Sequence, residues 1–166
     1  LGQKLNQALA GKVQELSKYQ SIFFKKIKEA LADRDDVIVS GDRFIFPSEI
    51  FFQSGSDVIQ DDGLKKLSKI AINLNEISQK IPKKIDWILR IDGHTDKVPI
   101  NNEEFNSNWH LSSSRAINIV KFLIKKGIPA HRLVAAGFGE NYPLDDNNNL
   151  TAYQKNRRIE IKLTTR

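Results

Sequence analysis

The sequence predicts an α+β domain, in which helices pack on one face of a mixed β-sheet, preceded by a long amphipathic helix. The chain contains segments whose apolar residues recur every three or four positions. Between them lie short segments in which apolar and polar residues alternate. Glycine, proline or asparagine marks most of the boundaries between these segments. The 166 residues have room for one core and an appendage. We therefore expect residues 1–36 to be a helical linker or dimerisation segment and residues 37–166 to be one domain.

The first predicted element is a helix from Gln3 to about Ala32. No proline interrupts it, and its apolar residues form one stripe at steps of three and four: Leu5, Leu9, Val13, Leu16, Tyr19, Phe23, Ile27 and Leu31. About 30 helical residues extend roughly 45 Å, which is longer than a domain of this size is wide. We therefore expect the front half to project and pair with a second copy of the chain, and the rear half to pack on the core.

The remaining elements alternate between strands and helices. A β-hairpin is predicted over residues 37–46, and a turn-rich loop follows over residues 51–57. The later elements are a helix over 63–80 capped by Asp61 or Asp62, a strand over 85–91, a polar loop over 92–106, a helix over 107–126, a strand over 133–138, a long loop to Leu150, a short helical turn capped by Thr151 and a last strand over 158–164. This order indicates a layer of helices on one face of a mixed sheet.

Composition narrows the possible functions. The sequence contains no cysteine, which excludes a disulfide framework, a thiolate nucleophile and a zinc or iron–sulfur site with cysteine ligands. Its apolar runs are far shorter than the ~18 residues that a transmembrane helix requires. The net charge is +6, but the basic residues are dispersed in pairs such as Lys25 and Lys26, as on solvated helix faces. We therefore expect no nucleic acid partner, and a polyanion-binding groove is kept as an alternative. The chain begins with leucine, and we expect it to be part of a longer protein.

Two polar clusters are candidates for a binding site. Residues 92–96 follow a predicted strand directly, which is where α/β folds usually place ligand sites. Residues 108–115 begin a predicted helix. Four of their side chains share one helix face and are expected to line a single pocket: Asn108, Leu111, Ser112 and Arg115.

Arg115 and Asp96 give this predicted pocket its chemistry. A guanidinium near a helix N-terminus presents a planar fork of donors that favours a carboxylate. The carboxylate of Asp96, facing it from the loop, would favour an ammonium group. One fixed cation and one fixed anion select a zwitterion, such as the ionic end of an amino acid.

Alternative interpretations of these polar residues stay open. Asp96 can instead cap its own loop, and Arg115 can pair with Glu103 or Glu104 at the surface. Arg157 and Arg158 resemble a phosphate clamp only weakly, since adjacent strand residues point in opposite directions.

Metal and catalytic sites receive little support. A metal site would use Asp92, His94, Asp96 and His110, whose spacing matches no specific metal motif. A serine nucleophile among residues 112–114 would need the glycine pattern of a nucleophile elbow, which is absent. We expect no metal, no cofactor and no enzymatic activity.

Five ordered motifs carry a resemblance to a known family. They are FQSGSDVI (52–59), GHTDKVPI (93–100), FNSNWHLSSSRA (105–116), AAGFGENYP (135–143) and NRRIEIKL (156–163). Together they resemble the OmpA/MotB C-terminal peptidoglycan-binding domain family over residues 42–164. The long loop after Thr-Asp and the Ser-Asn-Trp-x-Leu-Ser form resemble its MotB-like branch. The resemblance implies an OmpA-like fold.

The resemblance also implies a ligand and its site. Members of this family bind peptidoglycan without catalysis and hold the diaminopimelate of the stem peptide between an Asp and an Arg, which correspond to Asp96 and Arg115. The other positions implied in the site are Thr95, Asn108, Leu111, Arg158 and the backbone around Ser54, Gly55, Ser56 and Asp57.

The resemblance further implies a place in the cell envelope. We expect a periplasmic cell-wall anchor, tethered to the inner membrane by a segment outside this sequence and dimeric through its N-terminal helix. An inner-membrane channel or motor partner of the full-length protein is a further expectation. The alternatives are a hydrolase that acts on peptidoglycan and, less favoured, a basic domain that binds nucleic acid.

Overall fold

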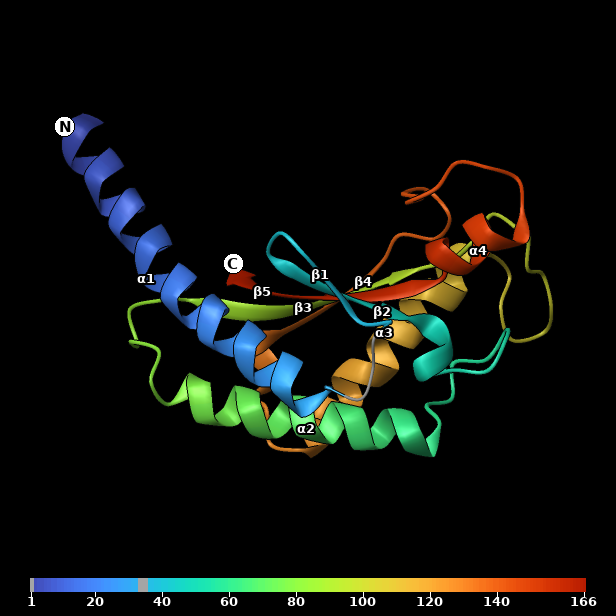
Figure 1. Cartoon of the computed structure of the whole chain (residues 1–166), viewed down its shortest axis with the longest axis horizontal. Coiled ribbons are helices and arrows are strands. Elements are labelled where there is room, and N and C mark those ends of the chain that lie inside the picture. The colour runs from blue at the N-terminus through green and yellow to red at the C-terminus, as the bar shows by residue number, and fades with distance from the viewer. Residues whose placement is uncertain (1, 33–35) are drawn as a thin grey trace.

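A computed structural model describes residues 2–32 and 36–166, without the side chains of residues 8–10, 12 and 13 (Figure 1). The helices are α1 (Gly2–Ala30), α2 (Asp61–Ser78), α3 (Asn108–Lys125) and α4 (Leu150–Asn156), with short 3-10 turns η1 (Ser48–Ile50) and η2 (Ala130–Arg132). The strands are β1 (Ile38–Ser40), β2 (Arg43–Pro47), β3 (Trp87–His94), β4 (Leu133–Gly137) and β5 (Arg158–Thr165). They form one sheet in the order β1-β2-β5-β3-β4, in which only the β3–β4 pair is parallel.

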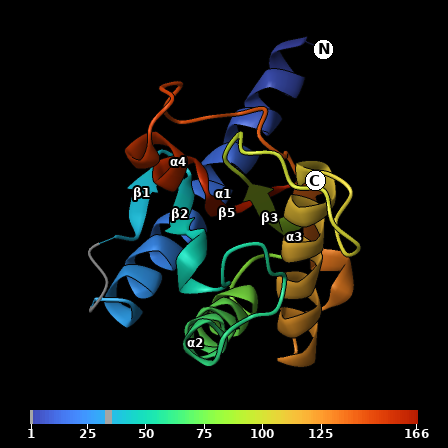
Figure 2. The same cartoon turned by 90° about the vertical axis from the view of Figure 1, so that its right-hand side faces the viewer.

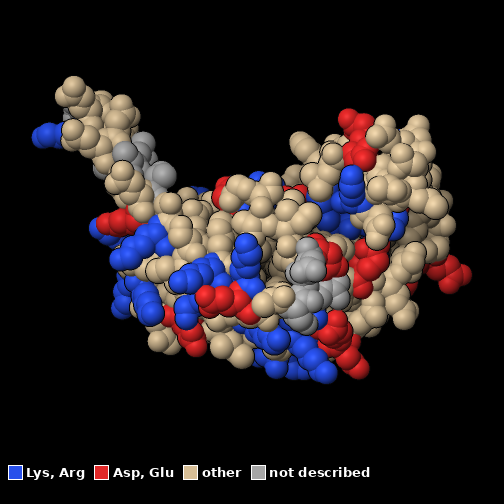
Figure 3. Space-filling view, in the orientation of Figure 1, with Lys and Arg blue, Asp and Glu red and all other residues tan. Residues whose placement is uncertain are grey.

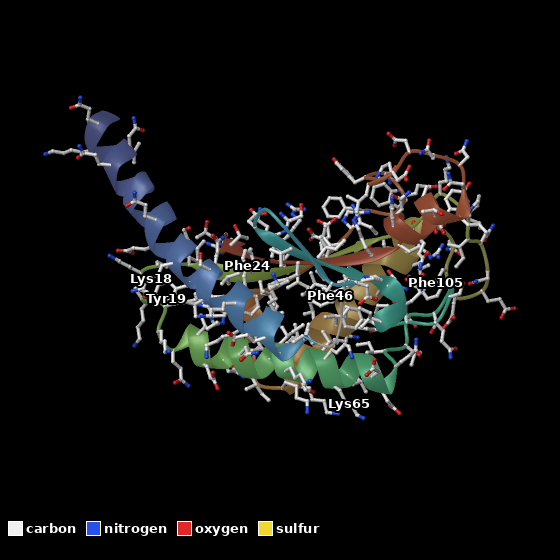
Figure 4. All side chains as sticks on the ribbon, in the orientation of Figure 1. Lys18, Tyr19, Phe24, Phe46, Lys65 and Phe105 are labelled. Carbon is white, nitrogen blue, oxygen red and sulfur yellow. The ribbon has the colours of Figure 1, made fainter. Side chains whose placement is uncertain are left out.

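The predicted fold class is confirmed. Helices α2 and α3 lie on the same side of the sheet, with the rear half of α1 beside α2 (Figures 1 and 2). One face of β2, β3 and β5 supplies the core, including Phe44 of β2, Leu89 of β3 and Ile161 of β5. In Figure 4, Phe46 lies between the sheet and α2, whereas Lys65 points away from the sheet. The alternation of apolar and polar residues in β5 therefore reflects one face on the core and one face away from it.

Helix α1 divides into two halves, as its length suggests. The rear half packs on the core through Phe23, whose ring meets that of Phe44 edge to face at 6.0 Å, and Gln20 donates a hydrogen bond to the carbonyl of Leu163. The front half extends past the sheet (Figure 1), where Leu5 is 62% exposed. The side chains of Leu9 and Val13, which the predicted stripe includes, lie outside the described residues, as do residues 33–35 near the expected boundary between linker and domain.

The capping predictions for α2 and α4 were wrong. Helix α2 begins at Asp61, so Asp61 and its neighbour lie in the first turn, where negative charge favours the helix dipole. Helix α4 begins before Thr151, and Asn149 caps it by accepting a hydrogen bond from Ala152 N at 2.8 Å. In both helices the N-cap position lies at least one residue before the predicted one. The reason is that the backbone leaves the extended conformation earlier than the apolar pattern indicates.

Strand β3 continues through three residues that the sequence assigned to a polar loop. Pairing with β5 reaches His94, and pairing with β4 reaches Gly93. The side chains of Asp92 and His94 point to the sheet face opposite α2 and α3, where Asp92 meets Arg90 and His94 stacks on Phe138 at 4.8 Å. These polar residues are buried in a central strand, which is why they resembled a loop in sequence.

No helix among the described residues is long and apolar enough to cross a membrane. On the face shown in Figure 3, lysine and arginine side chains are interspersed with aspartate and glutamate over α1 and α2. This distribution fits the solvated helix faces expected from the dispersed basic pairs.

Helix α3 approaches the sheet so closely that only glycine fits beneath it. A Cβ atom on Gly93 would lie 2.3 Å from the carbonyl oxygen of Ser112, and one on Gly137 would lie 2.0 Å from Ser113 Oγ. The first atom belongs to the helix backbone, which cannot rotate aside. The two glycines therefore fix the height of α3 above β3 and β4.

We predict that Gly93→Ala lowers the free energy of unfolding by about 1–3 kcal/mol, the usual cost of overpacking. Gly11→Ala on α1 is the matched control, because a Cβ atom there would meet no described atom within 4 Å and alanine is the better helix former by up to ~1 kcal/mol. Urea denaturation of both variants measures the difference. Equal stability of Gly93→Ala and the wild type would contradict the close approach.

A buried ionic cluster lies on the opposite face of the sheet. Glu160 accepts hydrogen bonds from Arg43 and from Arg158 Nε, the latter at 2.6 Å. His94 is 5% exposed, its Nε2 lies 3.4 Å from Glu160 Oε2, and neither ring nitrogen makes a hydrogen bond to the described part of the chain. Burial, reinforced by the charge of Arg158, lowers the pKa of His94 from 6.5 to about 4 despite the opposing charge of Glu160.

His94 should make stability depend on pH. Between pH 6.5 and 4 the unfolded chain binds a proton at His94 that the folded chain does not, so acidification through this range destabilises the fold by about 3 kcal/mol. We predict that His94→Gln flattens this part of the pH profile of the unfolding free energy, whereas the exposed control His131→Gln leaves it unchanged. An unchanged profile for His94→Gln would exclude this assignment.

Candidate binding site

A cavity of about 500 Å³ opens at the end of the sheet where η1, the loop after β3 and the start of α3 come together. Figure 2 looks onto this end of the molecule. The predicted site residues that line the cavity are Ser54, Gly55, Thr95, Asp96, Asn108, Leu111 and Arg115. Segments from residues 48 to 157 thus meet in one place.

Arg115 is the buried cation of the cavity. It lies two turns into α3, is 4% exposed and stacks over the ring of Phe52 with its Cζ 5.0 Å from the ring centroid. Its Nε donates to the carbonyl of Ser56 at 2.7 Å, and its Nη2 donates to the carbonyl of Gln53 at 3.2 Å. Among the described residues Arg115 makes no ion pair with a carboxylate, and its Nη1 donates no hydrogen bond.

Burial determines the electrostatics of Arg115. Loss of solvent lowers the pKa of this guanidinium to about 10, although Glu49 and Asp57 act in the opposite direction from a distance. The group therefore remains charged at neutral pH while being poorly hydrated. A carboxylate that entered the cavity would supply the counter-charge that the neutral carbonyl partners do not.

Asp96 is the carboxylate that faces the cavity from the loop after β3. Its Oδ1 accepts a hydrogen bond from Val98 N at 3.0 Å, which shapes the loop as an Asx turn. Its Oδ2 accepts from Arg157 Nη1 at 2.8 Å. Because a carboxylate has about four acceptor positions, Asp96 keeps acceptor capacity for a further donor. Its ion pair is with Arg157, and Arg115 is not part of that pair.

Asn108 fixes the loop against the helix. Ser107 caps α3 by accepting from His110 N at 3.3 Å, and Asn108 then begins the helix. The side chain of Asn108 donates to the carbonyls of Asp96 and Val98 at 3.3 and 3.1 Å. The beginning of α3 and the loop that carries Asp96 therefore move as one unit.

The loop of residues 53–57 is held by the same helix. Ser114 Oγ donates to Asp57 Oδ2 at 2.6 Å, and Asn118 donates to the carbonyl of Asp57 at 2.8 Å. Gly55 has a positive φ of 70°, a conformation that strongly favours glycine. Ser56 and Asp57 do not line the cavity, because their polar groups bind α3 and hold the loop that accepts from Arg115.

Arg158 lies away from the cavity, contrary to the position that the family resemblance implied. Its side chain is 3% exposed on the opposite face of the sheet, where it binds Glu160 and donates to the carbonyl of Tyr142 at 2.7 Å. The adjacent Arg157 lines the cavity instead. Consecutive residues at the start of a strand point in opposite directions, so only one arginine of this pair reaches the site.

Arg157 and Glu49 also line the cavity, although neither was among the predicted site residues. Arg157 Nε binds Glu49 Oε1 at 2.8 Å, so its guanidinium joins Glu49 to Asp96. Burial opposes its charge, but the hydrogen bonds to the two carboxylates raise the pKa of Arg157 above its ordinary value. Ser48, whose buried Oγ has no hydrogen-bond partner among the described residues, also lines the cavity. The paired arginines were a visible signal for Arg157, whereas nothing in the local sequence marked Glu49.

Ser112 has structural partners, and the candidate metal ligands are not grouped among the described residues. Ser112 Oγ accepts from Gly139 N at 3.0 Å and donates to the carbonyl of Trp109, so it does not face the cavity with Asn108 and Leu111. Within residues 2–32 and 36–166, no three His, Asp or Glu side chains are grouped so that they could hold a metal ion. The cavity thus presents a positive group at Arg115 and carboxylates at Asp96 and Glu49, an arrangement suited to binding a zwitterion.

Comparison with known proteins gives consistent matches. Residues 51–157 match the OmpA family. Motility protein B of Bacillus subtilis (strain 168) is 40% identical over 118 residues, which cover 70% of this chain and 42% of that protein. The chain spans less than half the length of the motility proteins B that it matches.

Solved structures match over more of the fold. The crystal structure of the periplasmic domain of Helicobacter pylori MotB has a TM-score of 0.64 and 29% identity, and the match covers 78% of each chain. The structure of the cell wall anchor of the T6SS from Pseudomonas aeruginosa has a TM-score of 0.66 and 25% identity, and the match covers 91% of this chain and 97% of that one.

Proposed function

This chain belongs to the OmpA family, and from that membership we propose that it binds bacterial peptidoglycan without catalysis, through the diaminopimelate of the stem peptide. One observation carries the proposal. Within the described residues, a buried guanidinium without a carboxylate partner and a carboxylate with spare acceptor capacity line the same cavity. The cavity volume, about 500 Å³, falls in the range of about 300–1,000 Å³ typical of small-molecule sites.

The chemistry of diaminopimelate suits these two groups. The free end of its side chain carries an ammonium and a carboxylate on one carbon. In the proposed complex, Arg115 receives the carboxylate and Asp96 receives the ammonium. Each charge-assisted hydrogen bond contributes about 1.5–3 kcal/mol. Leu111 and Phe52 provide apolar wall around the aliphatic chain. No covalent bond has to break, so the proposed role is adhesion, with many identical sites on the polymer to reinforce it.

The names of relatives support a place in the cell envelope. One matched structure is a periplasmic domain, and another is a cell wall anchor. We therefore place the chain in the periplasm, where it anchors a longer, membrane-tethered protein to the cell wall. An inner-membrane channel or motor partner is part of the same proposal, since motility protein B is among the relatives.

Two substitutions test the binding site. We predict that Arg115→Gln and Asp96→Asn each reduce binding to isolated cell-wall sacculi by about tenfold or more, because each removes one charge-assisted contact. Arg166→Gln is the matched control, since Arg166 is 81% exposed at the C-terminus. Co-sedimentation measures binding, and circular dichroism verifies the fold.

Two results would contradict the proposal. If Arg115→Gln and Asp96→Asn both pellet with sacculi as the wild type does, the cavity is not the binding site. If the wild-type protein releases soluble muropeptides from sacculi, the chain is a peptidoglycan hydrolase.

Residues 1–36 form a linker and dimerisation segment in this proposal. The front half of α1 extends beyond the domain (Figure 1). Leu5, on its predicted apolar stripe, is exposed. Pairing with the same helix of a second copy would remove this apolar surface from water. The rear half already has its partner in the core, including the buried Leu16 and Phe23.

We predict that Leu5→Glu shifts the chain from dimer to monomer, because it places a charge in the proposed helix pair. Gln3→Glu adds the same charge to a different face of α1 and should leave the dimer intact. Sedimentation velocity at several concentrations distinguishes the two states. A wild-type chain that is monomeric at all concentrations would rule out this role for α1.

A further inference from the structure

We infer that Glu49 determines the specificity of the cavity for an ammonium group, because it keeps the Asp96 end of the cavity negatively charged. This inference rests on the proposed function and adds to it a residue that selects one end of the ligand. Glu49 precedes the segment that matches the OmpA family, residues 51–157, so family membership does not assign it a role.

The geometry links Glu49 to Asp96 through one guanidinium. Arg157 binds Glu49 Oε1 through Nε and Asp96 Oδ2 through Nη1, each at 2.8 Å. The backbone reinforces this arrangement, because Ser48 N donates to the carbonyl of Arg157 at 3.0 Å. On the other side of Glu49, the side chain of Ile50 is buried in the core. Glu49 is therefore held beside Arg157 by the residues on both sides of it.

Glu49 supplies the net negative charge at the Asp96 end of the cavity. Asp96 and Arg157 alone carry −1 and +1, so their pair is neutral and offers an ammonium group little net attraction. With Glu49 the three groups carry −1, +1 and −1, which leaves one negative charge at this end of the cavity. An ammonium group that binds Asp96 then completes the balance, and Arg157 retains a carboxylate partner in Glu49.

Arg115 supplies the positive charge of the cavity, and Glu49 acts on it only from a distance, without a hydrogen bond. The partners of Arg115 within the described chain are carbonyls, so its positive charge is available to a ligand carboxylate. The nearby Asp57 is engaged by Ser114 and lies outside the cavity lining. The cavity thus has a positive end at Arg115 and a negative end at Asp96, and Glu49 sets the sign of the second.

Solvent exposure of Glu49 and Arg157 limits how much Glu49 changes the affinity for the ligand. The side chains of Arg157 and Glu49 are 35% and 47% exposed, so solvent and salt screen their charges in part. A partly exposed charge of this kind changes affinity by up to about fivefold. The effect should also diminish at high ionic strength, whereas a change in the shape of the cavity would not depend on salt.

The experiment compares two ligands and three variants by isothermal titration calorimetry at low salt. One ligand is the tripeptide L-Ala-γ-D-Glu-meso-diaminopimelate, and the other has 2-aminopimelate in the third position and so lacks the side-chain ammonium. We predict that Glu49→Gln binds the first ligand up to about fivefold more weakly than the wild type. It should bind the second no more weakly, because Glu49 also acts on Arg115 and its loss leaves that positive charge free for the ligand carboxylate. The difference for the first ligand should shrink in roughly 0.5 M salt.

The double variant Glu49→Gln with Arg157→Gln is the decisive control. It removes one negative and one positive charge, which restores a net −1 at Asp96, so its affinity for the diaminopimelate peptide should recover toward the wild-type value. The single variant Arg157→Gln should bind this peptide at least as tightly as the wild type.

Three results would overturn the role of Glu49: equal affinity of Glu49→Gln and the wild type, an equal loss for both ligands, or a double variant no tighter than Glu49→Gln. Failure of the proposed function gives a different result. In that case the wild type does not bind the diaminopimelate peptide, or Arg115→Gln binds it unchanged.

Discussion

The charge of a buried arginine is the constraint on which the site depends. Arg115 is placed inside the domain with two backbone carbonyls and an aromatic ring as partners, and no carboxylate of the described residues pairs with it. Burying a charge without a counter-charge costs free energy, and burial lowers its pKa accordingly. Arg115 stays buried despite this unfavourable free energy, because Ser114 and Asn118 fix α3 and the loop of residues 53–57 to each other. An entering carboxylate would recover part of that free energy.

The placement of α3 follows from its contact with the sheet. Gly93 and Gly137 allow the helix backbone to approach β3 and β4 more closely than any side chain would permit. Asn108 then connects the beginning of the helix to the loop that carries Asp96. The separation between the cation and the carboxylate of the cavity is therefore set by the close approach of two backbones and by the short side chain of Asn108, which vary less than contacts between long side chains.

Charged residues serve different purposes in the cavity and in the buried cluster on the sheet face opposite α2 and α3. Around Glu160 two arginines and the carboxylate bind one another, so these charged groups already have partners within the fold. Around Asp96 the charges are partly exposed and line a cavity. Arg157 and Arg158 stand next to each other in sequence and belong to these two different groups, because adjacent residues of a strand point in opposite directions.

The sequence by itself determined the fold class, the order of strands and helices and the placement of Asp96 and Arg115 around one cavity, because periodicity and ordered motifs are local properties of the chain. It misplaced the end of β3, since buried polar residues such as Asp92 resemble a loop when their partners are unknown. Only the tertiary structure decided which arginine reaches the cavity and brought Glu49 to it. The contact between Glu49 and Arg157 joins residues 108 positions apart. It depends on how β2, η1 and β5 pack, which no local pattern in the sequence shows.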